Sequence, residues 1–318
     1  MLATIMHDID PVAGNVGGLY VWWYGLSYTF GLLGMFAWLR GSRERLGLSL
    51  ADVYRLTSMV ALGVILGGRL FEVFWYEWAY YGEHLWHIPA IWLGGMSTHG
   101  ILMGGVLALA LFSLRTKRSF LELADALVIP TAFIMGVGRL GNFIDGQIVG
   151  AATSMPWGVD FPNTEGFRHP VVLYDGLKNL LLIPVLLLLR QKNAPRGVAL
   201  GAFLVGYGGL RIFVDFFREY RTTQFGLPPG QLVNAAMALL GVLLIAYGVW
   251  RQVRELPPPA PARSVGWGAR LLLAGLLLLP AIIPSDWPQD VPERYGARHP
   301  GMSHSTLYPP IPADQPTE

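Results

Sequence analysis

The chain has 318 residues, of which 53% are hydrophobic and 14% are charged, and its formal net charge is +2. Together with a mean hydropathy of +0.43, this composition excludes an ordinary soluble domain and predicts a polytopic membrane protein. The sequence contains no cysteine, which excludes disulfide bonds, a thiolate metal site and a cysteine nucleophile supplied by the chain itself.

Apolar segments long enough to cross a bilayer recur along the chain, so we expect an all-α helix bundle of seven or eight spans. The first eighteen residues include Asp8 and Asp10 but no Lys or Arg, so we expect no cleavable signal peptide. The expected spans are residues 19–39, 54–76, 97–114, 121–138, 171–189, 198–217 and 231–250, with a weaker eighth candidate at 269–284.

The basic residues predict the orientation of these spans. Most of the 23 Lys and Arg follow the first, third, fifth and seventh spans, and the positive-inside rule places those connections in the cytoplasm. The N-terminus is therefore expected outside. The connections expected to face outward are residues 77–96, 139–170 and 218–230.

Two of the outward connections have a distinct composition. Residues 77–96 are rich in Trp and Tyr, which favour the membrane–water boundary, so an interfacial belt or a short re-entrant segment is expected there. His84 and His87 lie in it, but two ligands are too few for a zinc site, so we expect surface histidines. Residues 139–170 are rich in Gly and Pro and are expected to form a small periplasmic head between the fourth and fifth spans.

The composition changes near residue 255. Residues 257–261 predict a stiff extended linker, and the short apolar segment 269–284 predicts an eighth span or a helix at the membrane interface. The last thirty or so residues are polar and rich in proline, and we expect them to be disordered. We therefore divide the chain into a transmembrane core, residues 1–255, and a C-terminal extension, residues 256–318.

Polar side chains gather near the outer ends of the expected spans. The segment 138–150 places an arginine, an asparagine and an aspartate among glycines where a span should end, and polar groups at that depth are costly unless they are used or paired. The residues expected to lie at this level are Tyr24, Arg69, His99, Arg139, Asn142, Arg211 and Asp215.

Arginines at one membrane depth repel one another unless an anion lies between them. A phosphate is the natural partner, because the planar guanidinium group binds its oxygens bidentately. Histidine titrates near neutral pH, so His99 is a candidate general base. Taken singly, each arginine is more simply explained by snorkelling to water, and His99 by a local hydrogen bond. Only their predicted location on one side of the membrane indicates a site.

In these segments the chain resembles the prolipoprotein diacylglyceryl transferases, which are bacterial inner-membrane enzymes. The resemblance covers roughly residues 8–250 and leaves out the C-terminal extension. The segments that carry it are Asp10-Pro11, Trp23-Tyr24-Gly25, Leu66 to Arg69, Gly95 to Gly100, Arg115 to Phe120, Gly138 to Gly150, His169-Pro170 with Leu173-Tyr174, Gly206 to Arg218, and Gly230-Gln231.

The resemblance implies transfer of the diacylglyceryl group of phosphatidylglycerol to the lipobox cysteine in the signal peptide of a preprolipoprotein, with release of glycerol phosphate. This is the first step of lipoprotein maturation. The implied partners are these two substrates and membrane lipids, and we expect no cofactor, metal ion or nucleic acid. The implied catalytic residues are His99 as the base, and Arg139 and Arg211 at the phosphate. The implied substrate-binding residues are Tyr24, Arg69, Asn142, Asp145, Gly150, Tyr207 and Asp215.

The chain also departs from the family pattern. Ile101 replaces a glycine, Val172 replaces a glutamine, Asp175 and Asp215 replace glutamates, and Asp145-Gly146-Gln147 stands where the family has Asn-Gly-Glu. Our hypothesis is that Asp145 takes the acidic role.

Two other classes of function compete with the transferase. One is a non-catalytic or re-specialised paralogue that binds phospholipid or lipoprotein precursors and does not need His99. The other is a transporter or channel. The polar groups expected at one face, and the lack of a convincing internal repeat, argue against the transporter or channel.

Overall fold

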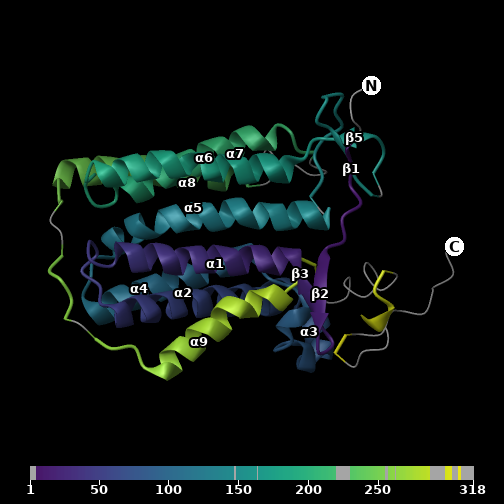
Figure 1. Cartoon of the computed structure of the whole chain (residues 1–318). Helices are drawn as coiled ribbons and strands as arrows, with labels where there is room; N and C mark the ends of the chain where they lie inside the picture. The colour runs from purple at the N-terminus through teal and green to yellow at the C-terminus, as the bar shows by residue number, and fades with distance from the viewer. Residues whose placement is uncertain are drawn as a thin grey trace.

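A computed structural model describes residues 5–146, 148–162, 164–219, 230–254, 257–261, 263–286, 298–302 and 307–308. It is mostly helical, and its longest helices lie side by side in a bundle (Figure 1). These helices are α1 (Trp23–Ser42), α2 (Leu50–Phe71), α4 (Thr98–Thr116), α5 (Phe120–Asp145), α6 (Val171–Gln191), α7 (Val198–Asp215) and α8 (Gln231–Arg251).

Six helices of the described chain are long and apolar enough to cross a membrane, namely α2 with its continuation to Tyr76, and α4, α5, α6, α7 and α8. This confirms the multi-pass helical membrane protein that hydropathy predicts. Helix α1 runs alongside them in the bundle over 20 residues. The shorter α9 (Trp267–Leu278) lies obliquely across α1 and α2. A count of seven or eight spans and the orientation of the termini remain predictions.

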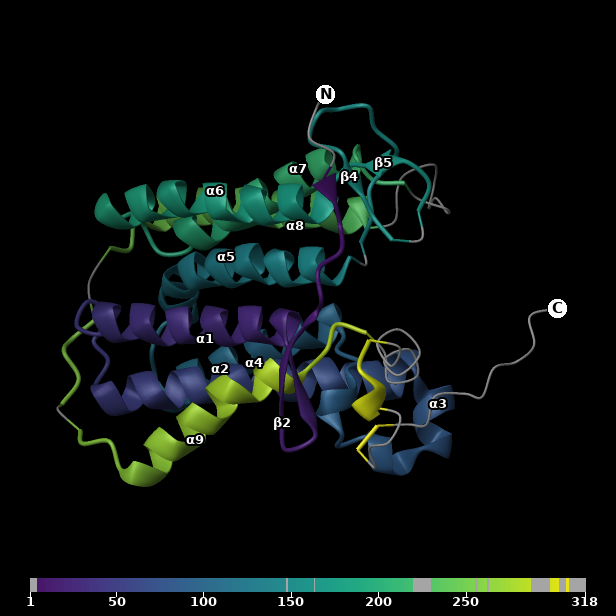
Figure 2. The same cartoon turned by 45° about the vertical axis from the view of Figure 1, so that its right-hand side comes forward.

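Helix α1 forms the middle of the bundle, with α5 on one side and α2 on the other (Figure 2). Helix α2 packs on α4, while α5 packs on α6, which in turn packs on α7, and α7 packs on α8. One apolar core joins α1, α2, α4, α5 and α9, and its fully buried members include Leu39, Leu56 and Phe112. A second core joins α5, α6 and α7.

Two of the expected helix boundaries are wrong. Residues Leu19–Trp22 form strand β3, which pairs antiparallel with β2 (Val12–Val16), so α1 begins at Trp23 rather than at residue 19. The fourth expected span ends at residue 138, whereas α5 continues to Asp145. Glycine weakens a helix, but at Gly141 it allows the backbone of α1 to approach α5 closely, and this packing favours continuation of the helix.

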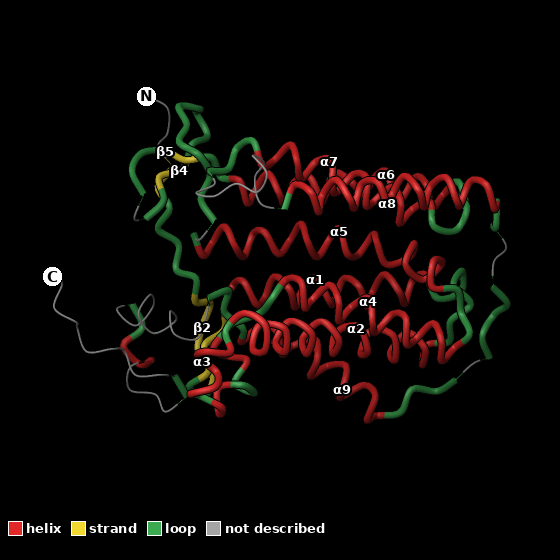
Figure 3. The backbone as a smooth tube through the Cα atoms, turned by 180° about the vertical axis from the view of Figure 1, so that it is seen from behind, coloured by secondary structure: helices red, strands yellow, loops and turns green. Residues whose placement is uncertain are grey.

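Short strands lie at one end of the bundle (Figure 3), so the all-α prediction holds for the bundle and not for every segment. Strand β4 (Val159–Asp160) pairs in parallel with β1 (Ile5–Met6) and antiparallel with β5 (Phe167–Arg168). Strands β4 and β5 lie within the segment predicted to form the head, and β1 joins them from the N-terminal segment. The aromatic connection contains α3 (Trp78–Glu83).

The C-terminal extension is packed against the core where the structure describes it. Within the tail expected to be disordered, Met302 and Tyr308 are buried against Tyr20 and Trp22 of β3. Packing on the antiparallel pair β2–β3 gives Met302 and Tyr308 a fixed environment, which composition does not reveal. Most of that tail lies outside the described residues, as does most of the connection 218–230. The division of the chain at residue 255 remains a prediction.

Candidate active site

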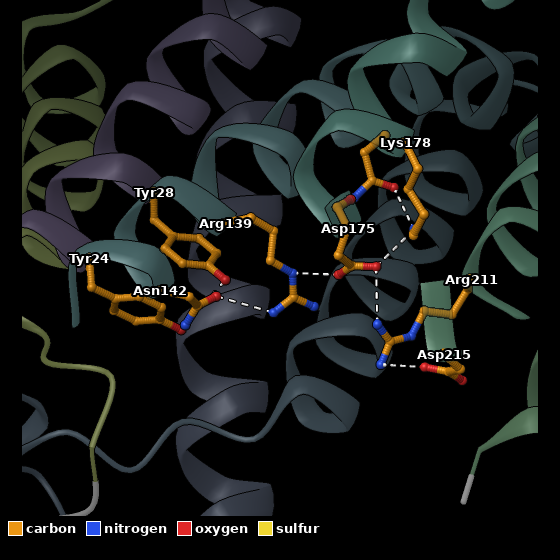
Figure 4. Close-up of polar contacts among 9 residues, drawn as sticks. Tyr24, Tyr28, Arg139, Asn142, Asp175, Lys178, Arg211 and Asp215 are labelled. Carbon is orange, nitrogen blue, oxygen red and sulfur yellow. Dashed lines mark hydrogen bonds and ion pairs between the residues drawn. The ribbon is translucent and has the colours of Figure 1, made fainter. Parts of the chain in front are cut away.

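The bundle brings the predicted polar residues to one end, where α1, α4 and α6 begin and α2, α5 and α7 end. Within this end they do not form a single group. Ion pairs and hydrogen bonds form a cluster across α5, α6 and α7, and Tyr24 of α1 lies beside it (Figure 4). The predicted residues drawn there are Tyr24, Arg139, Asn142, Arg211 and Asp215.

The Asp175 carboxylate lies at the centre of the cluster and is 3% exposed. Arg139 Nε lies 2.6 Å from Asp175 Oδ2, and Arg211 Nη1 lies 3.1 Å from Asp175 Oδ1. A third cation, Lys178 Nζ, lies 3.3 Å from the same Oδ1. The anion between the two arginines, which the sequence analysis expected to be a phosphate, is therefore a carboxylate of the chain itself in this structure.

The other contacts of the three cations fix their side chains. Arg139 Nη1 donates a hydrogen bond of 3.1 Å to Asn142 Oδ1, one turn further along α5. Arg211 Nη2 lies 3.4 Å from Asp215 Oδ1, one turn further along α7. Lys178 Nζ lies 3.7 Å from the centre of the Tyr207 ring, a cation–π contact. Tyr207 therefore lies in the cluster through its ring.

The charges of the cluster do not cancel. Among the described residues, Arg139, Lys178 and Arg211 face the carboxylates Asp175 and Asp215, so these ion pairs join three cations to two anions, one positive charge in excess. Within the described part of the chain, Asp175 and Asn142 engage Arg139 Nε and Nη1, and Asp175 and Asp215 engage Arg211 Nη1 and Nη2. In that part of the chain, Arg139 Nη2 and Arg211 Nε are left for other acceptors. A cluster with a surplus cation and remaining N–H donors can accept an anionic group.

Close helix packing positions the cluster. A Cβ atom on Gly141 would lie 2.6 Å from Tyr24 Cα, so α1 and α5 meet directly beside the cluster. A Cβ atom on Gly176 would lie 3.0 Å from Arg139 Cβ. Without side chains at these two positions, Tyr24 lies beside Asn142 and Arg139 reaches Asp175 (Figure 4).

Asp145 and Gly150 lie beyond the cluster, where α5 ends. Asp145 is 9% exposed, and its Oδ2 accepts a hydrogen bond from the Ser285 hydroxyl. A Cβ atom on Gly150 would lie 2.5 Å from the His169 carbonyl oxygen, so Gly150 serves the packing of the loops. Gln147, which the sequence analysis paired with Asp145, lies outside the described residues.

Arg69 is not part of the cluster. It is 3% exposed and donates hydrogen bonds to the carbonyl oxygens of the 87–95 loop, at His87, Ile88, Ala90, Gly94 and Gly95. With its donors engaged in this way, Arg69 holds the loop in place, and we do not assign it to a substrate. Burial, and secondarily the nearby His84, lowers the pKa of His87 in this loop below its usual value.

His99 also lies apart from the cluster. It is in the first turn of α4, which packs on α2, whereas the cluster lies on the opposite side of α1. Its Nδ1 is 3.0 Å from the Tyr76 hydroxyl, and its ring packs near Phe71. Among the described residues, no group of three or more His, Cys, Asp or Glu side chains is arranged to hold a metal ion.

Sequence reasoning did not assign Asp175 or Lys178 to the site. Lys178 had a signal that could have found it. It carries the only basic side chain in the expected span 171–189, three residues after the only acidic one, Asp175. A lone pair of opposite charges at helical spacing in an apolar segment indicates an intramembrane ion pair. That signal was present in the sequence.

A model of the prolipoprotein diacylglyceryl transferase family matches residues 11–247. The chain therefore belongs to this family. The match includes every residue of the ion-pair cluster and ends before the proline-rich linker at 257–261.

Relatives named phosphatidylglycerol–prolipoprotein diacylglyceryl transferase cover most of the chain. The protein of Geobacter sulfurreducens is 39% identical over 74% of this chain and 94% of its own length. The protein of Aeromonas hydrophila is 39% identical over 76% and 91%. The protein of Nitrosospira multiformis is 35% identical over 81% and 91%.

Proposed function

We propose that this chain transfers the diacylglyceryl group of phosphatidylglycerol to the lipobox cysteine of a preprolipoprotein and releases glycerol phosphate. Family membership over residues 11–247 supports the reaction. The observation that carries the assignment of the site is the surplus positive charge of the buried cluster formed by Arg139, Lys178 and Arg211 with two aspartates.

The chemistry requires a nucleophile that the chain does not contain, since it has no cysteine. The sulfur of the substrate cysteine attacks as the thiolate and forms a bond to the diacylglyceryl carbon that bears the phosphate. The bond between that carbon and the phosphate oxygen breaks, and its electron pair leaves with glycerol phosphate. Arg139 and Arg211 stabilise the charge that develops on the phosphate through the nitrogens that Asp175 does not engage.

The lipid head group lies against α1 and α5 in this proposal. Tyr24 and Asn142 border Arg139 (Figure 4) and orient the glycerol. Asp215 holds Arg211 from one helical turn away. His99 is the proposed base for the substrate thiol. Because His99 lies across α1 from the cluster, the substrate thiol must approach from the side of α4. The role of His99 as the base is therefore the assignment that a variant has to test.

The proposed topology has seven or eight spans, with the N-terminus and the 139–170 head on the periplasmic side of the inner membrane. Basic residues in alternate connections support this orientation. The end of the bundle that carries the cluster then faces the outer leaflet.

Transfer from phosphatidylglycerol to a lipobox peptide in proteoliposomes tests the proposal. We compare Arg139→Lys with the control Arg168→Lys. Arg168 lies at the same end of the protein and pairs with the exposed Glu219. Lysine keeps the charge but loses the planar fork, so Arg139→Lys should lower kcat at least tenfold. Arg168→Lys should leave transfer near the wild-type rate. Equal activity of both variants contradicts the role of Arg139.

A third variant, His99→Gln, decides the base. Collapse of transfer in this variant supports His99, and persistence of transfer removes it from the mechanism while keeping the enzyme. A wild-type protein that binds phosphatidylglycerol without transferring it would establish the non-catalytic paralogue.

A further inference from the structure

The C-terminal extension is built into the bundle. Helix α9 buries Leu273, Leu276 and Leu277 in the same core as α1 and α2. It then leads toward the end of the bundle where α1 begins (Figures 1 and 2). Residues 279–286, which we call the strap, follow it there.

The strap runs from the start of α1 to the 87–95 loop. A Cβ atom on Gly25 would lie 2.0 Å from the Pro280 carbonyl oxygen, so the strap touches the backbone of α1 one residue after Tyr24. Further along, the Asp286 carbonyl oxygen accepts a hydrogen bond of 2.8 Å from the Gly95 N–H. Gly95 belongs to the loop that Arg69 holds. The strap is therefore fixed on both sides by backbone contacts.

Ser285 lies between these two contacts. Its hydroxyl donates a hydrogen bond to Asp145 Oδ2 at the end of α5. Asp145 is buried, and it lies on α5 three residues after Asn142, which is about one helical turn from the ion-pair cluster. A hydrogen bond to a buried carboxylate fixes which way its oxygens point. The extension thus reaches Asp145 through the Ser285 side chain, although the family match ends at residue 247.

We propose that Ser285 is a positioning residue for transfer, which holds the Asp145 carboxylate in place beside the lipid head group through its hydroxyl. This rests on the proposed function. It makes the strap a working part of the site and not only a support for the bundle. Ser285 acts through Asp145 and does not itself contact the substrate.

The test is a double-mutant cycle in the proteoliposome assay, with kcat, KM and the melting temperature measured for each variant. The variants are Ser285→Ala, Ser285→Thr, Asp145→Asn and the combination of Ser285→Ala with Asp145→Asn. Leu271→Ala serves as the control, because Leu271 lies on α9 but is 68% exposed. The backbone contacts of the strap remain in all of these variants.

We expect Ser285→Ala to lower kcat/KM about tenfold, as loss of a hydrogen bond to a charged group does. Ser285→Thr keeps the hydroxyl and should restore transfer. The melting temperature should change no more than in Leu271→Ala. Because Ser285 acts through Asp145, the combined variant should be no slower than Asp145→Asn alone.

Three results would overturn the inference. They are wild-type transfer by Ser285→Ala, wild-type transfer by Asp145→Asn, and effects that multiply in the combined variant. Failure of the proposed function is recognised separately, since the wild-type protein would then transfer nothing. In that case the affinity for phosphatidylglycerol decides: a tenfold loss in Ser285→Ala upholds the positioning role, and an unchanged affinity refutes it.

Discussion

Replacement of Asp175 by asparagine tests the cluster most directly. The change keeps the size of the side chain and removes the one charge that Arg139, Lys178 and Arg211 share, at distances of 2.6, 3.3 and 3.1 Å. At an effective dielectric constant of about 20, two unit charges about 4 Å apart interact by about 4 kcal/mol. The three attractions do not simply add, because the cations also repel one another.

Removal of one partner from a buried ion pair costs about 3–5 kcal/mol, and we expect Asp175→Asn to lower the free energy of unfolding by that amount. Unfolding in mixed micelles, followed by circular dichroism, measures it. The matched control is Glu219→Gln, which makes the same chemical change in an ion pair whose carboxylate is 69% exposed. That change should cost less than about 1 kcal/mol.

A second variant checks whether the loss of stability comes from the unpaired cations. Adding Lys178→Met to Asp175→Asn removes one cation along with the carboxylate, so part of the lost stability should return. If Asp175→Asn unfolds like the Glu219→Gln control, the carboxylate does not hold the arginines together, and the reasoning fails.

Three further predictions concern the packing around the site. Gly141→Ala places a Cβ atom 2.6 Å from the backbone of α1 and should destabilise the protein by about 1–3 kcal/mol; Gly105→Ala, which meets only a side chain at 3.5 Å, should be neutral or slightly stabilising in the same melting assay. Arg69→Lys lacks the planar fork, so hydrogen–deuterium exchange in the 87–95 loop should rise at least tenfold, and unchanged exchange would contradict the role of Arg69. Burial lowers the pKa of His87 below 6.5 in the folded protein. The unfolded chain therefore binds the proton more tightly, and this contribution to stability is present above about pH 6.5 and is lost as the pH falls through the folded pKa. In His87→Gln, hydrogen–deuterium exchange in the 87–95 loop should therefore lose the acid-dependent increase expected for the wild type. An identical pH profile of exchange in the two proteins would refute the role of His87.

Hydropathy alone was sufficient to predict the membrane bundle, because each span must satisfy its backbone hydrogen bonds internally and must present apolar side chains to lipid. Its errors lie at the ends of spans. Leu19–Trp22 forms a strand because β2 lies beside it, and α5 continues through Gly141 because α1 packs there. Both outcomes depend on partners that are distant in the sequence.

The family motifs likewise predicted Arg139, Asn142 and Arg211 as residues of the site, and the structure brings these three into one ion-pair cluster. The sequence by itself therefore determined the class of protein, the family and most of the polar residues at one end of the bundle. Only the tertiary structure placed Asp175 between the two arginines, separated His99 and Arg69 from them, and brought Ser285 to Asp145. These arrangements depend on which faces the helices turn toward one another, and a hydropathy profile contains no information about those faces.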